Sequence, residues 1–142
     1  MSIIFLMAGR GSRFKETGYA VPKVLIEVRG KPMVKWATDS LSFIKQPKMI
    51  FICLKDQDEK YNLEIKLKEI YGKDITVLFV DRVTEGAAIT ALLAKEIINS
   101  EEELIVSNTD QFFSAKEFES LLEMKKKNFS GAIPLFEATH PR

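Results

Sequence analysis

The chain has 142 residues, of which 46% are hydrophobic and 29% charged, with a formal net charge of +1. This length suits one domain with a buried core, and the near-zero charge gives no support to a nucleic-acid-binding protein. One cysteine, no apolar run near the roughly 20 residues that span a membrane, and no signal-peptide pattern predict a cytoplasmic protein without an internal disulfide or membrane insertion.

Five short apolar runs predict β-strands. They cover residues 3–7, 49–54, 75–80, 104–107 and 131–136. The runs are nearly continuous rather than alternating, which is typical of parallel strands covered on both faces.

Helical patterns separate these runs. The expected helices cover residues 32–44, 59–71, 86–98 and 114–127. Pro32 suits a first helical position, Gly72 ends the second helix, and Ser114 is the expected N-cap of the last. The helix over 86–98 is small and apolar, so we expect it to pack tightly on the sheet. The alternation predicts an α/β three-layer fold with a mostly parallel sheet.

The first strand leads into a glycine-containing loop that carries two arginines, with the sequence AGRGSRF over residues 8–14. Glycines let backbone N–H groups approach phosphate oxygens, and arginines neutralise their charge, so the loop predicts a polyphosphate-binding site. Phe14 stands where a dinucleotide fingerprint has its third glycine, and the Gly-Lys-Ser/Thr of a Walker A loop is absent. The alternative is a tight strand-to-helix turn with solvated arginines.

Two further segments are expected beside this loop, because ligands bind outside the carboxyl ends of the strands in an open parallel sheet. Pro22 restricts the backbone before Lys23, so its ammonium is held where it could stabilise charge on a triphosphate. Gly86 and the alanines after it leave backbone exposed for a flat base, and Glu85 could accept a hydrogen bond. Taken alone, these features also fit a surface lysine and tight helix–sheet packing.

A carboxylate follows the strand over 104–107. Asp110 at this strand's carboxyl end could hold Mg²⁺ against phosphate oxygens. The alternative is an aspartate that caps a turn. Asp81 occupies a similar place after the strand over 75–80, but Arg82 adjoins it and could neutralise it, so Asp110 is preferred.

These motifs together resemble the nucleoside-triphosphate transferases, which include nucleotide-sugar pyrophosphorylases and phosphocholine cytidylyltransferase-like enzymes of cell-surface polysaccharide pathways. The resemblance rests on FLMAGRGSRF (5–14), PK (22–23), GKPM (30–33), EGAA (85–88) and LIVSNTD (104–110). The first of these sequences is specific, whereas the later ones would be weak alone.

The resemblance implies a Rossmann-like α/β fold and a Mg²⁺-dependent reaction. A phosphate oxygen of a phosphorylated small-molecule acceptor attacks the α-phosphorus of a nucleoside triphosphate, and pyrophosphate leaves. By the same resemblance Arg13 and Lys23 are catalytic, Arg13 holding the leaving phosphates and Lys23 contacting the α-phosphate, while Asp110 holds the metal. The implied nucleotide-binding residues are Ala8, Gly9, Gly11, Ser12, Arg13, Glu85, Gly86 and Ala87.

Two departures from the family pattern affect these expectations. Thr109 stands where the family usually has glycine before its metal-binding aspartate, which would crowd the turn. Relatives also continue further, and no candidate for their second acidic metal ligand follows Glu137. We therefore expect residues 1–142 to form a single nucleotidyltransferase domain that lacks its acceptor-binding part. A capsule or similar sugar pathway and a pyrimidine nucleotide are favoured, and an exposed sheet edge would promote a homo-oligomer.

Other functions remain open at this point. A non-catalytic nucleotide-binding regulatory module would keep the phosphate loop without turnover. A dinucleotide oxidoreductase domain is disfavoured by the missing third glycine. A glycosyltransferase of related fold would place two nearby acids around its metal, whereas residues 107–110 offer only one.

Overall fold

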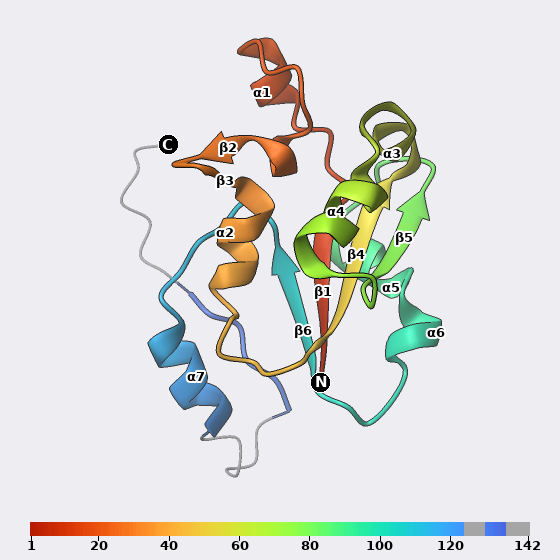
Figure 1. Cartoon of the computed structure of the whole chain (residues 1–142). Helices are drawn as coiled ribbons and strands as arrows, with labels where there is room; N and C mark the ends of the chain where they lie inside the picture. The colour runs from red at the N-terminus through yellow and green to blue at the C-terminus, as the bar shows by residue number, and fades with distance from the viewer. Residues whose placement is uncertain (124–129, 136–142) are drawn as a thin grey trace.

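Four parallel strands form the central sheet, in the order β5-β4-β1-β6 (Figure 1). The computed structural model describes residues 1–123 and 130–135. The strands are β1 (Ser2–Met7), β4 (Lys48–Leu54), β5 (Thr76–Val80) and β6 (Leu104–Asn108). These four strands lie within one residue of their expected bounds, so the predicted parallel sheet is confirmed. A separate antiparallel hairpin joins β2 (Glu27–Val28) to β3 (Lys31–Pro32).

Helices cover both faces of the sheet, which confirms the predicted three-layer α/β fold (Figure 1). One face packs on α2 (Met33–Asp39) and α4 (Leu63–Tyr71). The other packs on α5 (Ala87–Leu92) and α6 (Lys95–Ile98). The remaining helical elements are α1 (Ser12–Glu16), the 3-10 turn η1 (Lys23–Leu25), α3 (Lys55–Tyr61) and α7 (Ala115–Glu123).

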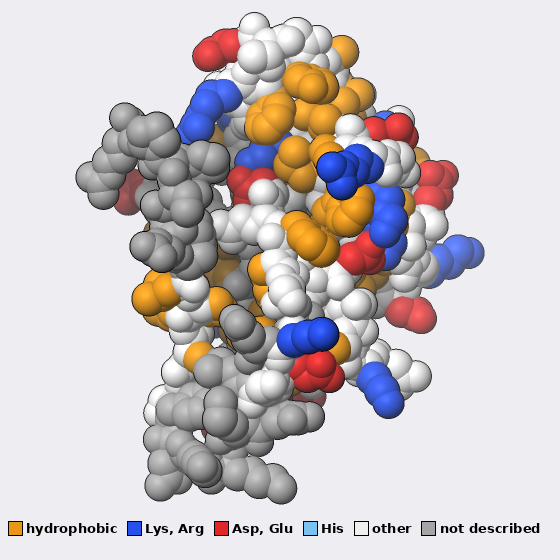
Figure 2. All heavy atoms as spheres, turned by 90° about the vertical axis from the view of Figure 1, so that its left-hand side faces the viewer, with side chains coloured by type: hydrophobic (Ala, Val, Ile, Leu, Met, Phe, Trp, Pro, Cys, Tyr) orange, Lys and Arg blue, Asp and Glu red, His pale blue; other side chains and the backbone are white. Residues whose placement is uncertain are grey.

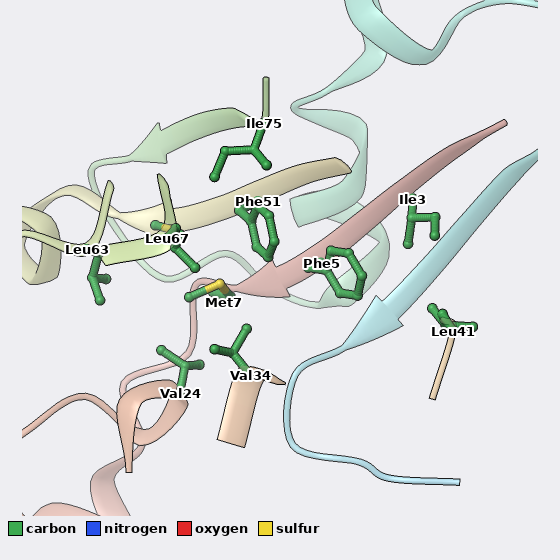
Figure 3. Close-up of a cluster of buried hydrophobic side chains, with 11 residues drawn as sticks. Ile3, Phe5, Met7, Val24, Val34, Leu41, Phe51, Leu63, Leu67 and Ile75 are labelled. Atoms are coloured by element: carbon green, nitrogen blue, oxygen red, sulfur yellow. The ribbon is translucent and has the colours of Figure 1, made fainter. Parts of the chain in front are cut away.

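The larger core cluster lies between the sheet and the layer that contains η1, α2 and α4, and aromatic rings stack within it (Figure 3). The ring of Phe51 lies 5.0 Å from that of Phe5 and 5.1 Å from that of Tyr71, measured between centroids. Leu63 and Leu67 of α4 are fully buried beside these rings. Because both faces of β1 and β4 are covered, their sequences are continuous apolar runs. Burial also raises the pKa of the Cys53 thiol to about 12, as expected for an inert core cysteine.

Three of the predicted helices are shorter than expected. The helix over 59–71 is divided into α3 and α4 by Asn62, whose φ of 53° is left-handed, a conformation that asparagine tolerates. The helix over 86–98 is divided into α5 and α6. The helix over 32–44 begins after Pro32 and ends at Asp39, where tight turns with i to i+3 hydrogen bonds replace the α-helical ones.

The edge strand β6 and the neighbouring α5 are less covered than the sequence predicts. Leu104 and Val106 on one face of β6 are 40% and 47% exposed. Ile89 and Leu92 of the α5 region are 49% and 59% exposed. Within the described residues, the expectation of strands covered on both faces therefore holds for β1 and β4 but is wrong for β6.

The fifth predicted strand is also wrong. Residues 131–135 form no strand, and Ile133 and Leu135 are 85% and 90% exposed. Pro134 within this run has no N–H group to donate to a ladder, which disfavours a paired strand. Residue 136 and the lysine-rich helix end expected over 124–127 lie outside the described residues.

Charges of both signs are interspersed on the surface. Figure 2 shows hydrophobic side chains gathered on the upper half of one face, with lysine, arginine and acidic side chains scattered among them. This mixture fits the net charge of +1. Within residues 1–123 and 130–135, no helix has the length and apolar character required to cross a membrane.

The aromatic stack gives a test of the core. We expect Phe51→Ala to lower the free energy of unfolding by about 3–5 kcal/mol, because the ring loses both stacking partners and leaves a cavity. Phe51→Leu should cost less, and Ile65→Ala on the exposed side of α4 should cost less than about 0.5 kcal/mol. Urea unfolding followed by circular dichroism measures all three, and equal losses for Phe51→Ala and Ile65→Ala would contradict this account.

Candidate active site

A cavity of about 330 Å³ opens at the carboxyl ends of the parallel strands. Five segments contribute to its lining: residues 6–9, 23–24, 57, 108–110 and part of 83–90. The carboxyl ends of β1 and β6 therefore meet the 3-10 turn η1 and the start of α5 around one space. This is the place where open parallel sheets bind ligands.

Opposite charges meet at this cavity. The Lys23 ammonium forms an ion pair with a carboxylate oxygen of Asp110, although the two residues are 87 positions apart. Their side chains are 27% and 39% exposed, so both remain accessible to a ligand. The Lys23 ammonium also lies 5.6 Å from the ring centroid of Phe14. Each charge thus compensates the other in the free protein.

The backbone of the glycine-containing loop suits a close approach to Lys23. Gly11 has a φ of 60°, and a Cβ there would stand only 3.1 Å from the Cβ of Lys23. A larger residue would therefore be strained and would push Lys23 away. Within the described chain, the N–H groups of Arg10, Gly11, Ser12 and Arg13 donate to no backbone carbonyl. An anion would therefore not have to replace a backbone hydrogen bond at any of these four consecutive donors.

The sequence-predicted residues divide into two groups. Those that line the cavity are Ala8, Gly9, Lys23, Gly86, Ala87 and Asp110. The side chains of Ser12, Arg13 and Glu85 are exposed outside its lining, and Gly11 lies beside Lys23. Asp81, the second candidate for a metal ligand, is exposed and does not line the cavity.

Hydroxyl groups order the segment that leads into α5. The hydroxyls of Thr84 and Thr90 each lie 3.1 Å from the Gly86 carbonyl oxygen and within hydrogen-bond distance of one another. Thr90 is buried, whereas Gly86 and Ala87 are exposed at the cavity. The segment therefore presents backbone and small side chains to the cavity, as a flat base would require.

The departure from the family pattern at Thr109 has a structural role. This residue is only 5% exposed, and its hydroxyl donates to the Leu6 carbonyl at 3.1 Å. The bond extends the contact between β1 and β6 beyond their last backbone pair, Leu6 with Asn108. Crowding at this turn is thus offset by a hydrogen bond that holds Asp110 next to the loop.

Gln57 is a cavity residue that the sequence motifs do not predict. This residue follows β4, lines the cavity, and is 6% exposed. Its side-chain amide donates to the Gly9 carbonyl at 3.3 Å. Its position just after a buried strand could have indicated this role, because the carboxyl ends of parallel strands meet at the same edge of a sheet.

The neighbouring Asp56 contacts the same loop. Arg10 donates from Nη1 to Asp56 Oδ2 at 2.7 Å, so the first arginine of the loop is directed towards α3. This hydrogen bond holds the pKa of the Asp56 carboxyl below its usual value of 3.8. The second arginine, Arg13, has no such partner among the described residues.

The acidic groups at the cavity limit how a metal could be held. Asp110 is the acidic residue in the described lining, and the described residues contain no cluster of three or more histidine, cysteine, aspartate or glutamate side chains with metal-binding geometry. Mg²⁺ commonly binds through one or two carboxylates together with substrate phosphates and water. A single carboxylate such as that of Asp110 is thus compatible with a Mg²⁺ site whose other ligands are substrate phosphates and water.

A comparison with protein families matches residues 3–141 to the model of the MobA-like NTP transferase domain. The chain belongs to this family. The resemblance inferred from residues 5–14 and the four later segments is thereby confirmed. A comparison with curated proteins found no significant match.

Solved structures show that the fold is shared with known proteins. The CTP:phosphocholine cytidylyltransferase from Streptococcus pneumoniae is 25% identical with a TM-score of 0.59, over 80% of this chain and 49% of its own. The inositol-1-phosphate CTP transferase from T. maritima is 22% identical with a TM-score of 0.71, over 84% and 47%. The nucleoside-diphosphate-sugar pyrophosphorylase from Vibrio cholerae RC9 is 24% identical with a TM-score of 0.64, over 80% and 49%. The chain spans about half the length of these proteins and shares their Rossmann-like fold.

The ion pair between Arg10 and Asp56 can be tested by titration. We expect Arg10→Gln to raise the pKa of the Asp56 carboxyl towards its usual value, because the hydrogen bond and the positive charge are lost. The pKa of the Asp56 carboxyl is lower in the folded protein than in the unfolded chain. The pair therefore stabilises the wild type at pH values above the pKa of the unfolded chain. This stabilisation is lost as the pH falls through the pKa of the folded protein. Carboxyl NMR titration measures the change.

Asp39 is the control for this titration. Burial would raise the pKa of its carboxyl, but hydrogen bonds and charges from Lys35 and Lys31 hold it below its usual value. Its titration should not respond to Arg10→Gln. An unchanged Asp56 titration in that variant would show that the ion pair does not persist in solution.

Proposed function

We propose that this protein is a nucleotidyltransferase that uses a nucleoside triphosphate and a phosphorylated small-molecule acceptor. An acceptor phosphate oxygen attacks the α-phosphorus and forms a new P–O bond. The bond from the α-phosphorus to the bridging oxygen breaks, and pyrophosphate leaves. The chain itself forms no covalent intermediate, so its contribution is positioning and charge stabilisation.

The observation that carries this proposal is the meeting of Lys23 and Asp110 beside the glycine-containing loop, around one cavity of about 330 Å³. A cation that contacts a triphosphate and a carboxylate that holds its metal need to lie together, and these two come from distant parts of the chain. The free N–H groups of residues 10–13 add donors for the phosphate oxygens. Family membership supports the same chemistry.

The residues take the following roles in the proposal. Lys23 contacts the α-phosphate, where negative charge builds up during attack. Arg13 reaches the leaving β- and γ-phosphates from α1, and Gly86 and Ala87 accommodate the base. Asp110 holds Mg²⁺, which when bound neutralises phosphate charge and assists the departure of pyrophosphate. Because Lys23 is paired with Asp110 in the free protein, this ion pair would have to open for Lys23 to contact the nucleotide and for Asp110 to hold a metal.

A phosphorylated sugar, or a similar small molecule, is the proposed acceptor. Two structurally similar proteins are named for CTP together with phosphocholine or inositol-1-phosphate. The CTP in these names favours a pyrimidine nucleotide. A third similar protein is named as a nucleoside-diphosphate-sugar pyrophosphorylase, which supports a sugar phosphate as acceptor. The proposed role in cell-surface polysaccharide synthesis rests on the resemblance of the sequence motifs alone.

The first test is calorimetric titration with ATP, GTP, CTP and UTP, each with and without Mg²⁺. Binding of one nucleotide that tightens with Mg²⁺ is expected, followed by pyrophosphate release with phosphorylated acceptors. Binding without turnover for any acceptor would instead favour the non-catalytic nucleotide-binding module. No binding by any nucleotide would contradict the proposal for this chain.

Charge variants provide a sharper prediction. Lys23→Ala should weaken nucleotide binding about 10- to 100-fold, because it removes a charge-assisted hydrogen bond and leaves the Asp110 carboxylate facing the phosphates. Without Mg²⁺, Asp110→Asn should bind nucleotide at least as tightly as the wild type, because a negative charge that faces the phosphates is removed. With Mg²⁺, its affinity should not increase as that of the wild type does. Arg13→Ala should also weaken binding. Calorimetry measures the dissociation constants.

Lys95→Ala is the matched control, because Lys95 is exposed on α6 and does not line the cavity. Its dissociation constant should equal that of the wild type. If Lys23→Ala and Lys95→Ala bound equally well, the assignment of Lys23 would be wrong.

A further inference from the structure

The first turn of α3 touches the glycine-containing loop through two consecutive residues. Asp56 accepts a hydrogen bond from the Arg10 side chain at 2.7 Å, and Gln57 donates one to the Gly9 carbonyl at 3.3 Å. Two consecutive residues of α3 thus bind two consecutive residues of the loop. These contacts join segments 46 and 48 positions apart, and their partners in α3, Asp56 and Gln57, lie outside the motifs on which the sequence-based assignment rests.

The side chain of Gln57 is well placed to act as a rigid support. It is 6% exposed, so its amide lies in a poorly hydrated environment where a lost partner would be costly. It also follows directly from β4, whose residues 50–54 are fully buried. Its position is therefore fixed by the core rather than by the loop that it contacts.

The hydrogen bond to Gly9 determines the direction of the next donor. The chain has no cis peptide bonds among its described residues, and in a trans peptide the carbonyl and the following N–H point in opposite directions. When the Gly9 carbonyl faces Gln57, the N–H of Arg10 points away from it. This N–H is the first of the four loop donors that no backbone carbonyl accepts in the described part of the chain.

The ion pair between Arg10 and Asp56 is the second contact between α3 and the loop. The side chains are 50% and 48% exposed, so the pair contributes little to global stability. Its effect is local, because it directs the guanidinium of Arg10 towards α3. The cations that the proposed function assigns to a triphosphate are Lys23, which pairs with Asp110, and Arg13, which has no ion-pair partner among the described residues.

We propose that Asp56 and Gln57 form a clamp that orders the loop over residues 9–13 before nucleotide binds, with Gln57 as a positioning residue. This inference rests on the proposed function, because the loop is taken to bind phosphates. The clamp reduces the conformational freedom that the loop would otherwise lose on binding. Gln57 acts through the Gly9 peptide and touches no reacting atom.

The first part of the test concerns the free protein. Gln57→Met keeps the length of the side chain but removes its N–H donor. Amide ¹⁵N relaxation should show order parameters for Arg10 and Gly11 falling from about 0.85 towards about 0.6, with the rest of the backbone unchanged. Glu59→Met, on the exposed side of the same helix, is the matched control and should leave the loop ordered.

The second part concerns nucleotide binding. Gln57→Met should raise the dissociation constant about 3- to 10-fold, the effect expected from one neutral hydrogen bond, while the melting temperature changes little. Gln57→Glu adds a readout that packing alone would not produce. Its ionised carboxylate cannot donate to the Gly9 carbonyl, whereas its protonated form can. Relative to the wild type at each pH, its loop order and affinity should recover as the pH is lowered.

The outcomes separate the two proposals. If the wild type binds no nucleoside triphosphate, the proposed function fails, whatever the loop does. If the wild type binds but Gln57→Met leaves both the loop order parameters and the affinity unchanged, the clamp is wrong and the proposed function stands. A Gln57→Glu variant whose defect does not depend on pH would also overturn the positioning role.

Discussion

The parallel pairing of β1 with a strand on each side is the constraint on which the rest of the structure depends. β1 pairs along its whole length with β4, and from Ser2 to Leu6 with β6. Its backbone is paired along both edges, and its side chains are covered on both faces by helices. The loop that follows β1 must therefore emerge between the segments that follow β4 and β6. Every group of the candidate active site is placed relative to this loop.

This arrangement explains how side chains from both neighbours reach the same backbone. Gln57 comes from the segment after β4 and bonds to Gly9, whereas Thr109 comes from the segment after β6 and bonds to Leu6. Carbonyl groups near the end of β1 and in the loop just after it are thus held from two sides. A backbone fixed in this way has less conformational entropy to lose when an anion binds.

The charges of the site compensate one another in the free protein. Lys23 and Asp110 form an ion pair that remains partly exposed, and partly exposed pairs exchange partners at little cost. A triphosphate accompanied by a cation offers each of them a new partner of opposite charge. The proposed chemistry therefore needs no large rearrangement of the core, because only two side chains change partners.

Much of the fold could be predicted from the sequence because it depends on local patterns. Continuous apolar runs located four strands to within one residue, and Gly72 ended α4 as expected. The run over 131–136 has the same apolar pattern, but a strand also needs a neighbouring strand to pair with. The described residues 131–135 form no strand, and Ile133 and Leu135 are exposed. Pro134 also lacks the N–H group that a paired strand would use. The break at Asn62 was missed because a single left-handed residue leaves the hydrophobic period almost unchanged.

The sequence by itself determined the fold class, the family, and the types of residue available for phosphate and metal chemistry, because these follow from short segments that can be recognised one at a time. Only the tertiary structure decided which of those residues meet. It paired Lys23 with Asp110, turned Arg10 towards Asp56, and brought Gln57 to the loop. Such contacts depend on the order of strands in the sheet and on the register between them, which no single segment encodes.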